Sequence, residues 1–121
     1  RKTRCFPSLG SVDVTAIGTW VEIVADLDAD YLIEGWCWGD TADVTGAFFE
    51  VDFAACPQGS LPSPDDIQAR GIYRRAGSSQ SPAGHEQFFH PFIAYKGERL
   101  MATLAARSGA DPILMLYGRR I

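Results

Sequence analysis

The chain has 121 residues, of which 46% are hydrophobic and 21% charged, and its net charge is −4. This length supports one domain with one core, since a chain of this mass buries roughly 65% of its unfolded surface on folding, and the composition is that of an ordered domain. The sequence has no apolar run approaching the roughly 20 residues of a membrane-spanning helix and no hydrophobic stretch of a secretory signal, so we expect neither membrane insertion nor export.

Short segments of alternating apolar and polar residues predict β-strands in the first half of the chain. A period of two is typical of a strand with one buried and one solvated face. The clearest case is residues 47–54, where Phe49, Val51 and Phe53 alternate with acidic residues. The Asp-rich segment 26–30 is predicted to be a turn. The strands expected in this half are 12–16, 21–25, 31–38 and 47–54.

The second half begins with CPQGSLPSPDD at 56–66, whose three prolines cannot donate to a central strand ladder. A helix of about two turns is predicted from Ser63, which would cap it, to Gly71, which would end it. Residues 76–86 are expected to form a loop. Pro91 indicates an edge strand or a bulge. The strands expected in this half are 72–75, 88–95 and 113–117, the last an unbroken apolar run typical of a strand buried on both faces.

Residues 98–107 carry two contradictory patterns. Their Glu, Leu, Met and Ala content favours a helix that Gly109 would cap, whereas alternating leucines and alanines fit a strand, and pattern alone leaves both open. About eight strands joined mostly by short turns indicate an all-β fold, a single-domain antiparallel β-sandwich of jelly-roll type. We assign residues 1–10 to an N-terminal arm and residues 11–121 to the sandwich.

Charge is distributed unevenly along the chain. Residues 5–69 contain twelve acidic residues and no Lys or Arg, whereas residues 70–121 contain eight basic and three acidic ones. In a sandwich these regions interleave, so we expect them to neutralise each other between neighbouring strands. The alternative is a two-sided molecule that docks its neighbours charge to charge. Nucleic-acid binding is not expected, because the balance is acidic and no Lys/Arg stripe interleaves with aromatic residues.

Metal and cofactor sites are not expected. The cysteines, Cys5, Cys37 and Cys56, lack C-x-x-C spacing, and one disulfide would leave a thiol over, so we predict three free thiols. His85 and His90 flank Glu86 but are five residues apart, whereas the zinc-protease motif needs four on a helix. The acidic turn at 26–30 begins like a calcium loop but lacks its glycine and its bidentate glutamate.

Catalysis is not expected either, because no G-x-S-x-G elbow occurs and nothing singles out a pair of carboxylates. Trp36 and Trp38 lie on the same face of one predicted strand, in GWCWG. Such a pair belongs either to the core or to an exposed platform for a glycan or a partner. A second candidate stacking surface is the aromatic group Phe88, Phe89, Phe92 and Tyr95, and burial of these rings discriminates between the alternatives.

Two blocks of the sequence resemble a family of small bacteriophage virion proteins. Its strand "G-[ST]-W-V-E-[IL]" and turn "D-A-D-[WY]-L" correspond to residues 18–23 and 28–32. Its closing motifs "A-G-x-R-[IL]-A-x-R" and "L-Y-G" correspond to residues 97–107 and 116–118. The blocks cover about half of the chain; the glycine-rich middle stretch of the family is absent, and CPQGSLPSPDD is particular to this sequence.

The resemblance implies a β-sandwich located in the virion, assembled in the host cytoplasm, without a cofactor, and it favours a strand at residues 98–107. We therefore expect a non-catalytic structural protein, first of all a capsid decoration protein that stabilises the head, with the major capsid protein or other virion subunits as partners and a homo-trimer favoured. The alternative is a tail- or spike-associated module that binds a glycan or a receptor. The cations Arg1, Lys2 and Arg4 are expected to be disordered in isolation and to reach a neighbouring subunit.

Overall fold

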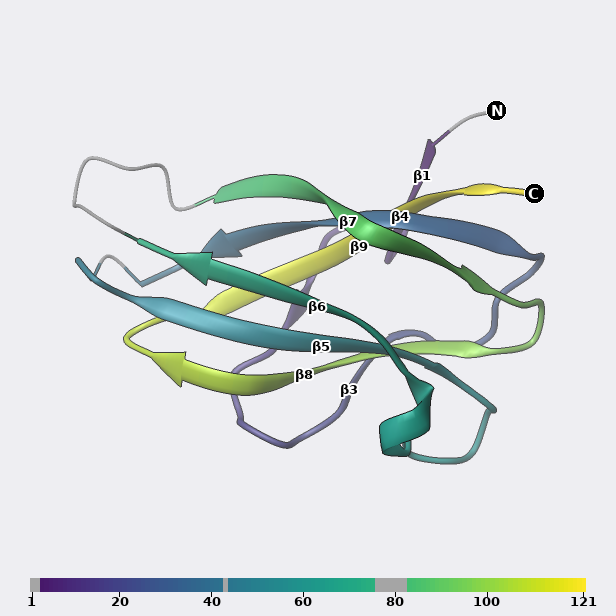
Figure 1. The fold of residues 1–121 in the computed structure, drawn as a ribbon, viewed down its shortest axis with the longest axis horizontal. Helices are drawn as coiled ribbons and strands as arrows, with labels where there is room; N and C mark the ends of the chain where they lie inside the picture. The colour runs from purple at the N-terminus through teal and green to yellow at the C-terminus, as the bar shows by residue number, and fades with distance from the viewer. Residues whose placement is uncertain (1–2, 43, 76–82) are drawn as a thin grey trace.

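The computed structural model describes residues 3–42, 44–75 and 83–121 and contains two antiparallel sheets packed face to face (Figure 1). The five-stranded sheet has the order β1-β9-β4-β7, with β2 also paired to β9, and the four-stranded sheet has the order β3-β8-β5-β6. The strands are β1 Thr3–Phe6, β2 Val12–Asp13, β3 Val21–Val24, β4 Tyr31–Asp40, β5 Phe48–Cys56, β6 Ile67–Arg74, β7 Ala83–Ala94, β8 Arg99–Ser108 and β9 Pro112–Arg120. The predicted all-β sandwich is confirmed.

The order of the strands is that of a jelly roll. Both β1 and β2 pair with the same edge of β9, so together they act as one interrupted strand. From there the chain passes repeatedly between the sheets: β3 lies in the four-stranded sheet, β4 in the other, β5 and β6 in the first, then β7, β8 and β9 alternate. Eight strands connected in this way form the double Greek key of a jelly roll.

The core lies between the two sheets and is rich in aromatic rings. In β5 the side chains of Phe49, Val51 and Phe53 are fully buried, as the alternation predicted. Trp36 of β4 packs edge to face on both phenylalanines, with ring centroids 5.9 Å and 5.6 Å away. Burying each such side chain stabilises the fold by about 1.5–3 kcal/mol.

The helix predicted from Ser63 to Gly71 is wrong beyond its first turn. A 3-10 turn at Pro64–Asp66, with Ser63 and Asp66 forming a capping box, is followed directly by β6. The remaining residues form a strand because they pair with β5 along its length. Gly71 is not a helix terminator but a close-contact position, since a Cβ there would lie 2.4 Å from the Trp36 ring.

Residues 98–107, which fitted both helix and strand, form most of β8. This strand lies between β3 and β5, so both of its edges are hydrogen-bonded. Its Leu100, Ala102 and Leu104 side chains are buried toward β4 and β9. Tertiary pairing therefore overrides the helix propensity of the segment.

A bulge in β4 decides which side chains of this strand enter the core. Ile33 and Gly35 pair with consecutive residues of β9, so Glu34 is an extra residue without a partner in the ladder. Tyr31 and Ile33 point inward before the bulge, and Trp36 points inward after it. The extra residue shifts the alternation by one position.

Residues 3–6, which the sequence analysis assigned to an arm, belong to the sheet. They form β1, and Phe6 is 2% exposed and meets the Tyr31 ring edge to face. A short charged segment does not look like a strand in the sequence. Pairing with β9 and the burial of one aromatic ring stabilise it, so the predicted boundary at residue 11 is wrong for this segment.

Candidate functional site

The outer face of the five-stranded sheet carries apolar side chains that the described chain leaves partly exposed. In β9, Leu114 and Leu116 are buried in the core, so their neighbours Ile113, Met115 and Tyr117 point outward, where they are half-buried. The apolar run in β9 had predicted a strand buried on both faces. That prediction is wrong for the part of the chain that the structure describes, in which the outward side chains of β9 are only half-buried.

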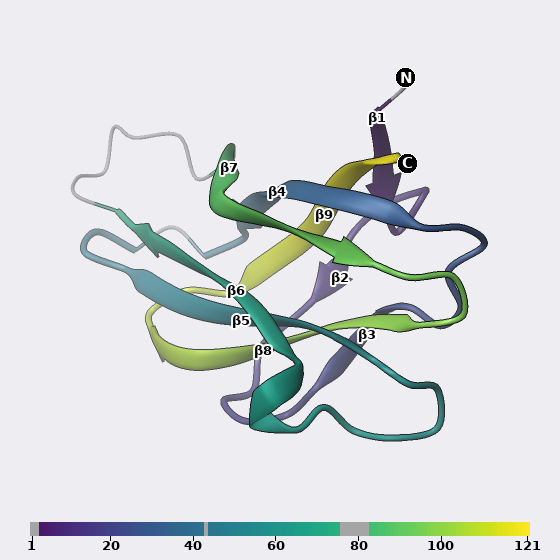
Figure 2. The ribbon, with the colours of Figure 1, turned by 45° about the vertical axis from the view of Figure 1, so that its right-hand side comes forward.

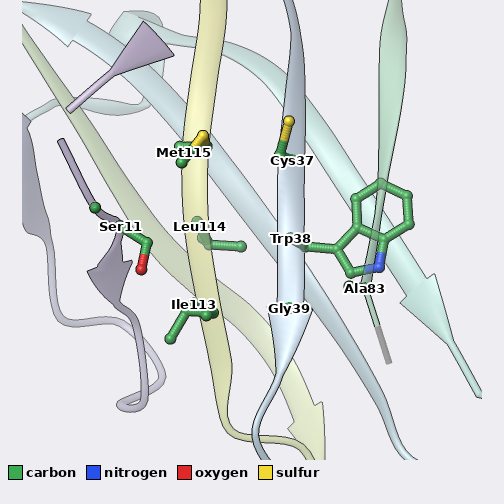
Figure 3. Close-up of a pocket in the computed structure, with 9 residues that line it drawn as sticks. Ser11, Cys37, Trp38, Gly39, Ala83, Ile113, Leu114 and Met115 are labelled. Carbon is green, nitrogen blue, oxygen red and sulfur yellow. The ribbon is translucent and has the colours of Figure 1, made fainter. Parts of the chain in front are cut away.

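A hollow of about 330 Å³ lies on this outer face (Figure 3). Strands β9 and β4 form its floor, and the segment between β1 and β2 contributes one rim. Its lining is mostly apolar and consists of Gly10, Ser11, Cys37, Trp38, Gly39, Ala83, Ile113, Leu114 and Met115. Burial, with a smaller contribution from nearby Cys5, raises the pKa of the Cys37 thiol. The uncharged thiol therefore adds to the apolar character of the hollow.

The outer face of the four-stranded sheet differs, because the chain covers part of it. Met101, Ala54 and Cys56 point away from the core, yet none is more than 2% exposed. The connection between β5 and β6 returns over this region, where the carbonyl of Ser60 accepts a hydrogen bond of 2.8 Å from Arg99 Nη1. Figure 2 shows this connection and the 3-10 turn on the side of the sheet away from β4 and β9.

Ion pairs connect the acidic and the basic regions of the sequence. Asp52 and Arg70 face each other on β5 and β6 at 2.7 Å, and Arg70 donates to both carboxylate oxygens. Further pairs between the two regions are Glu22–Arg99 at 3.3 Å and Glu34–Arg119 at 3.8 Å. Neutralisation between neighbouring strands, the first of the two interpretations of the charge pattern, is confirmed for these residues.

Arg4, one of the three cations predicted to contact a neighbour, is bound within its own chain. Its guanidinium donates to both carboxylate oxygens of Asp28 at 3.0 Å and to the Tyr31 hydroxyl, which itself donates to Asp28. These bonds raise the pKa of Arg4 and lower that of Asp28. The predicted disorder of Arg4 is therefore wrong, while Arg1 and Lys2 lie outside the described residues.

The tryptophan pair is not an exposed platform. Trp36 is fully buried, and Trp38 is half-buried against it, with ring centroids 4.5 Å apart. The Trp38 indole extends from β4 toward the start of β7 (Figure 3), where it lies so close to Gly84 that a Cβ there would come within 2.7 Å. Of the two predictions for this pair, membership of the core is the correct one.

The four rings of the second aromatic group differ in exposure. Phe88 and Phe92 are buried at 8% and 6% exposure, whereas Phe89 is 93% and Tyr95 55% exposed. The residues 88–91 of β7 lie opposite Glu34 of β4 alone, so the ladder is interrupted there, as Pro91 indicated. Phe88 thus fills the core, while the next residue, Phe89, points to solvent.

A groove of about 250 Å³ lies beside Phe89, between the edge strands of the two sheets. Strand β6 contributes Gln68, Ala69 and Arg70, and β7 contributes Phe88, Phe89 and His90. Sequence analysis had missed this groove, because it combines strands from different sheets.

The carboxylates of the acidic turn at 26–30 and the two histidines make contacts other than with one another. Asp28 binds Arg4, whereas Asp30 accepts a hydrogen bond of 2.8 Å from the backbone N–H of Lys96. His85 lies opposite Cys37, and His90 meets the Phe89 ring edge to face at 4.8 Å. In the described part of the chain, no three His, Cys, Asp or Glu side chains gather as a metal site, and all three cysteines are free thiols.

No protein-family model and no curated protein matches this chain. Among the residues that the structure describes, no helix has the length and apolar character needed to cross a membrane. Functional inference therefore depends on the surfaces themselves.

Proposed function

We propose that the protein is a non-catalytic structural component of a bacteriophage particle, namely a capsid decoration protein that binds through the outer face of its five-stranded sheet. The observation that carries this proposal is the apolar hollow on that face, floored by β4 and β9. Partly exposed apolar side chains gathered around a hollow are typical of a surface that another protein covers.

The two outer faces differ in how far the chain covers their apolar side chains, and this difference supports the proposal. On the four-stranded sheet, the chain itself buries the outward side chains of Met101, Ala54 and Cys56. The corresponding side chains of β9, Ile113 and Met115, stay half-exposed in the described structure. Covering them on assembly would add favourable burial of about 25 cal/mol for each Å² of apolar surface removed from water.

A decoration protein of this kind acts by linkage. A ligand that binds only the assembled shell shifts the equilibrium toward the shell, and no catalytic group is required. We propose the major capsid protein or another virion subunit as the partner and the virion as the location, with a homo-trimer as the favoured state. Jelly rolls occur in capsid proteins and also in lectins, so the fold alone does not decide the function.

Substitution of Met115 tests the proposal on purified particles. We expect Met115→Asp to reduce retention of the protein on particles at least tenfold, because a carboxylate would be buried in an apolar contact. The matched control is Ile72→Asp, since Ile72 is 50% exposed on the outer face of the four-stranded sheet. Unchanged retention of a folded Met115→Asp protein would contradict the proposal.

A further inference from the structure

We infer that the groove between β6 and β7 binds a neutral sugar ring, with Phe89 as the stacking surface and Arg70 as the main hydrogen-bond donor. This inference is independent of the proposed attachment to the particle, because the groove and the apolar hollow have no lining residue in common. It assigns a second binding activity to the protein.

The aromatic part of the groove is the ring of Phe89, which lies where the ladder between β4 and β7 is interrupted. Phe89 is 93% exposed, while the adjacent Phe88 is buried and packs edge to face on Phe53 at 5.5 Å. The His90 ring stands at 87° to the Phe89 ring, with centroids 4.8 Å apart, and supports it from one side. An apolar ring face held out to solvent is suited to the C–H face of a sugar.

The polar part of the groove comes from the Arg70 guanidinium, which Asp52 holds in a fixed orientation. Asp52 is 8% exposed and accepts from Nε at 2.7 Å and from Nη2 at 3.2 Å. Because these two bonds use one edge of the guanidinium, the Nη1 donors point away from Asp52. A positioned donor of this kind binds hydroxyl groups without first losing side-chain entropy.

The charge of the groove favours a neutral ligand over an anion. The positive charge of Arg70 is already balanced by Asp52, so a phosphate or a carboxylate would gain little net attraction. A volume of about 250 Å³ is below the range of roughly 300–1,000 Å³ typical of sites for drug-sized ligands. One ring with several hydroxyl groups fits both the size and the chemistry.

The test is a titration followed by amide chemical shifts. The probes are methyl glucoside, methyl galactoside and N-acetylglucosamine, with inorganic phosphate as the anion control. We expect at least one sugar to give saturable shifts confined to residues 68–70 and 88–90, with a dissociation constant on the order of 1 mM. No saturable shift with any of the three sugars, or equal binding of phosphate, would overturn the inference.

Two variants test the assigned residues. Phe89→Ala should weaken sugar binding at least tenfold, and its exposure means that the fold will persist. Arg70→Lys keeps a cation beside Asp52 but loses the paired donors, so we expect binding to weaken several-fold. Leu9→Ala is the matched control, since Leu9 is 90% exposed but lies outside the groove. Unchanged sugar affinity of Phe89→Ala would refute the assignment, whether or not that variant also detaches from particles.

Discussion

Met101 and Met115 occupy corresponding positions in the two sheets. Each lies in an inner strand, β8 or β9, and each points away from the shared core. Met101 is 2% exposed because neighbouring parts of the chain cover it, whereas Met115 is half-buried and lines an open hollow. The same residue type in equivalent places thus has different surroundings.

The two surfaces therefore differ in what would cover them. Folding alone covers Met101, whereas a binding partner would be needed to cover Met115. The connection between β5 and β6, with Ser60 bonded to Arg99, covers part of the outer side of the four-stranded sheet. Over the hollow of the five-stranded sheet, the described chain provides only a rim, at Gly10 and Ser11. The first surface should therefore matter for stability, and the second for binding.

The largest difference in stability is expected between two single substitutions, Met101→Ala and Met115→Ala. Met101→Ala removes a buried side chain and should lower the free energy of unfolding by about 2–4 kcal/mol. Met115→Ala removes a partly solvated side chain and should cost less than about 1 kcal/mol in the isolated protein. Urea denaturation measures both values. Equal losses would mean that the two faces are equally covered in solution, for instance by self-association.

An intermediate effect is expected from the ion pairs on the two faces. Arg70→Ala leaves the buried Asp52 carboxylate without its partner, but Arg70 is half-exposed, so we expect a loss of about 1 kcal/mol. Arg119 meets Glu34 at 3.8 Å, and Arg119→Ala should cost less than about 0.5 kcal/mol. Thermal melting of the two variants compares the pairs directly. A larger loss of stability for Arg119→Ala than for Arg70→Ala would contradict the expected ranking of the two ion pairs.

The smallest effect concerns Asp28 at the edge of the five-stranded sheet. Hydrogen bonds from Tyr31 and then from Arg4 lower the pKa of this carboxyl in the folded state. Its contribution to stability is therefore present above the unfolded pKa of about 3.9 and is lost as the pH falls through the folded pKa. The stability difference between wild type and Asp28→Asn should narrow on acidification, measured by urea denaturation at several pH values. A difference independent of pH would show that Asp28 acts only through its shape.

The sequence predicted the class of fold because alternation is a local property. Residues 47–54 showed which side chains β5 buries, and the turn at 26–30 separated β3 from β4. The ends of β6 and β7 were predicted poorly, since they depend on pairing with β5 and β4. Helix propensity near Ser63 correctly indicated the capped turn but not its short length.

The candidate sites could be predicted only in part, because exposure depends on neighbours that the sequence does not specify. Phe88 and Phe89 are adjacent and identical in type, and which of them is buried depends on the face of β7 that packs on Phe53 of β5. Met101 and Met115 likewise cannot be distinguished by local pattern. Arg4 was predicted to reach a neighbouring subunit, whereas the ion pair that the structure shows is with Asp28 of its own chain.

The bulge at Glu34 has a genetic consequence. Loss of the Glu34 codon would remove the extra residue and pair β4 with β9 in continuous alternation, so that Ile33, Trp36 and Trp38 would still point inward. Loss of one codon in the exposed connection near Gly59 would shorten a loop without changing any face. Both deletions would therefore keep the tryptophans in the core, whereas loss of the Cys37 codon would turn Trp38 outward, because every residue beyond that deletion would change faces.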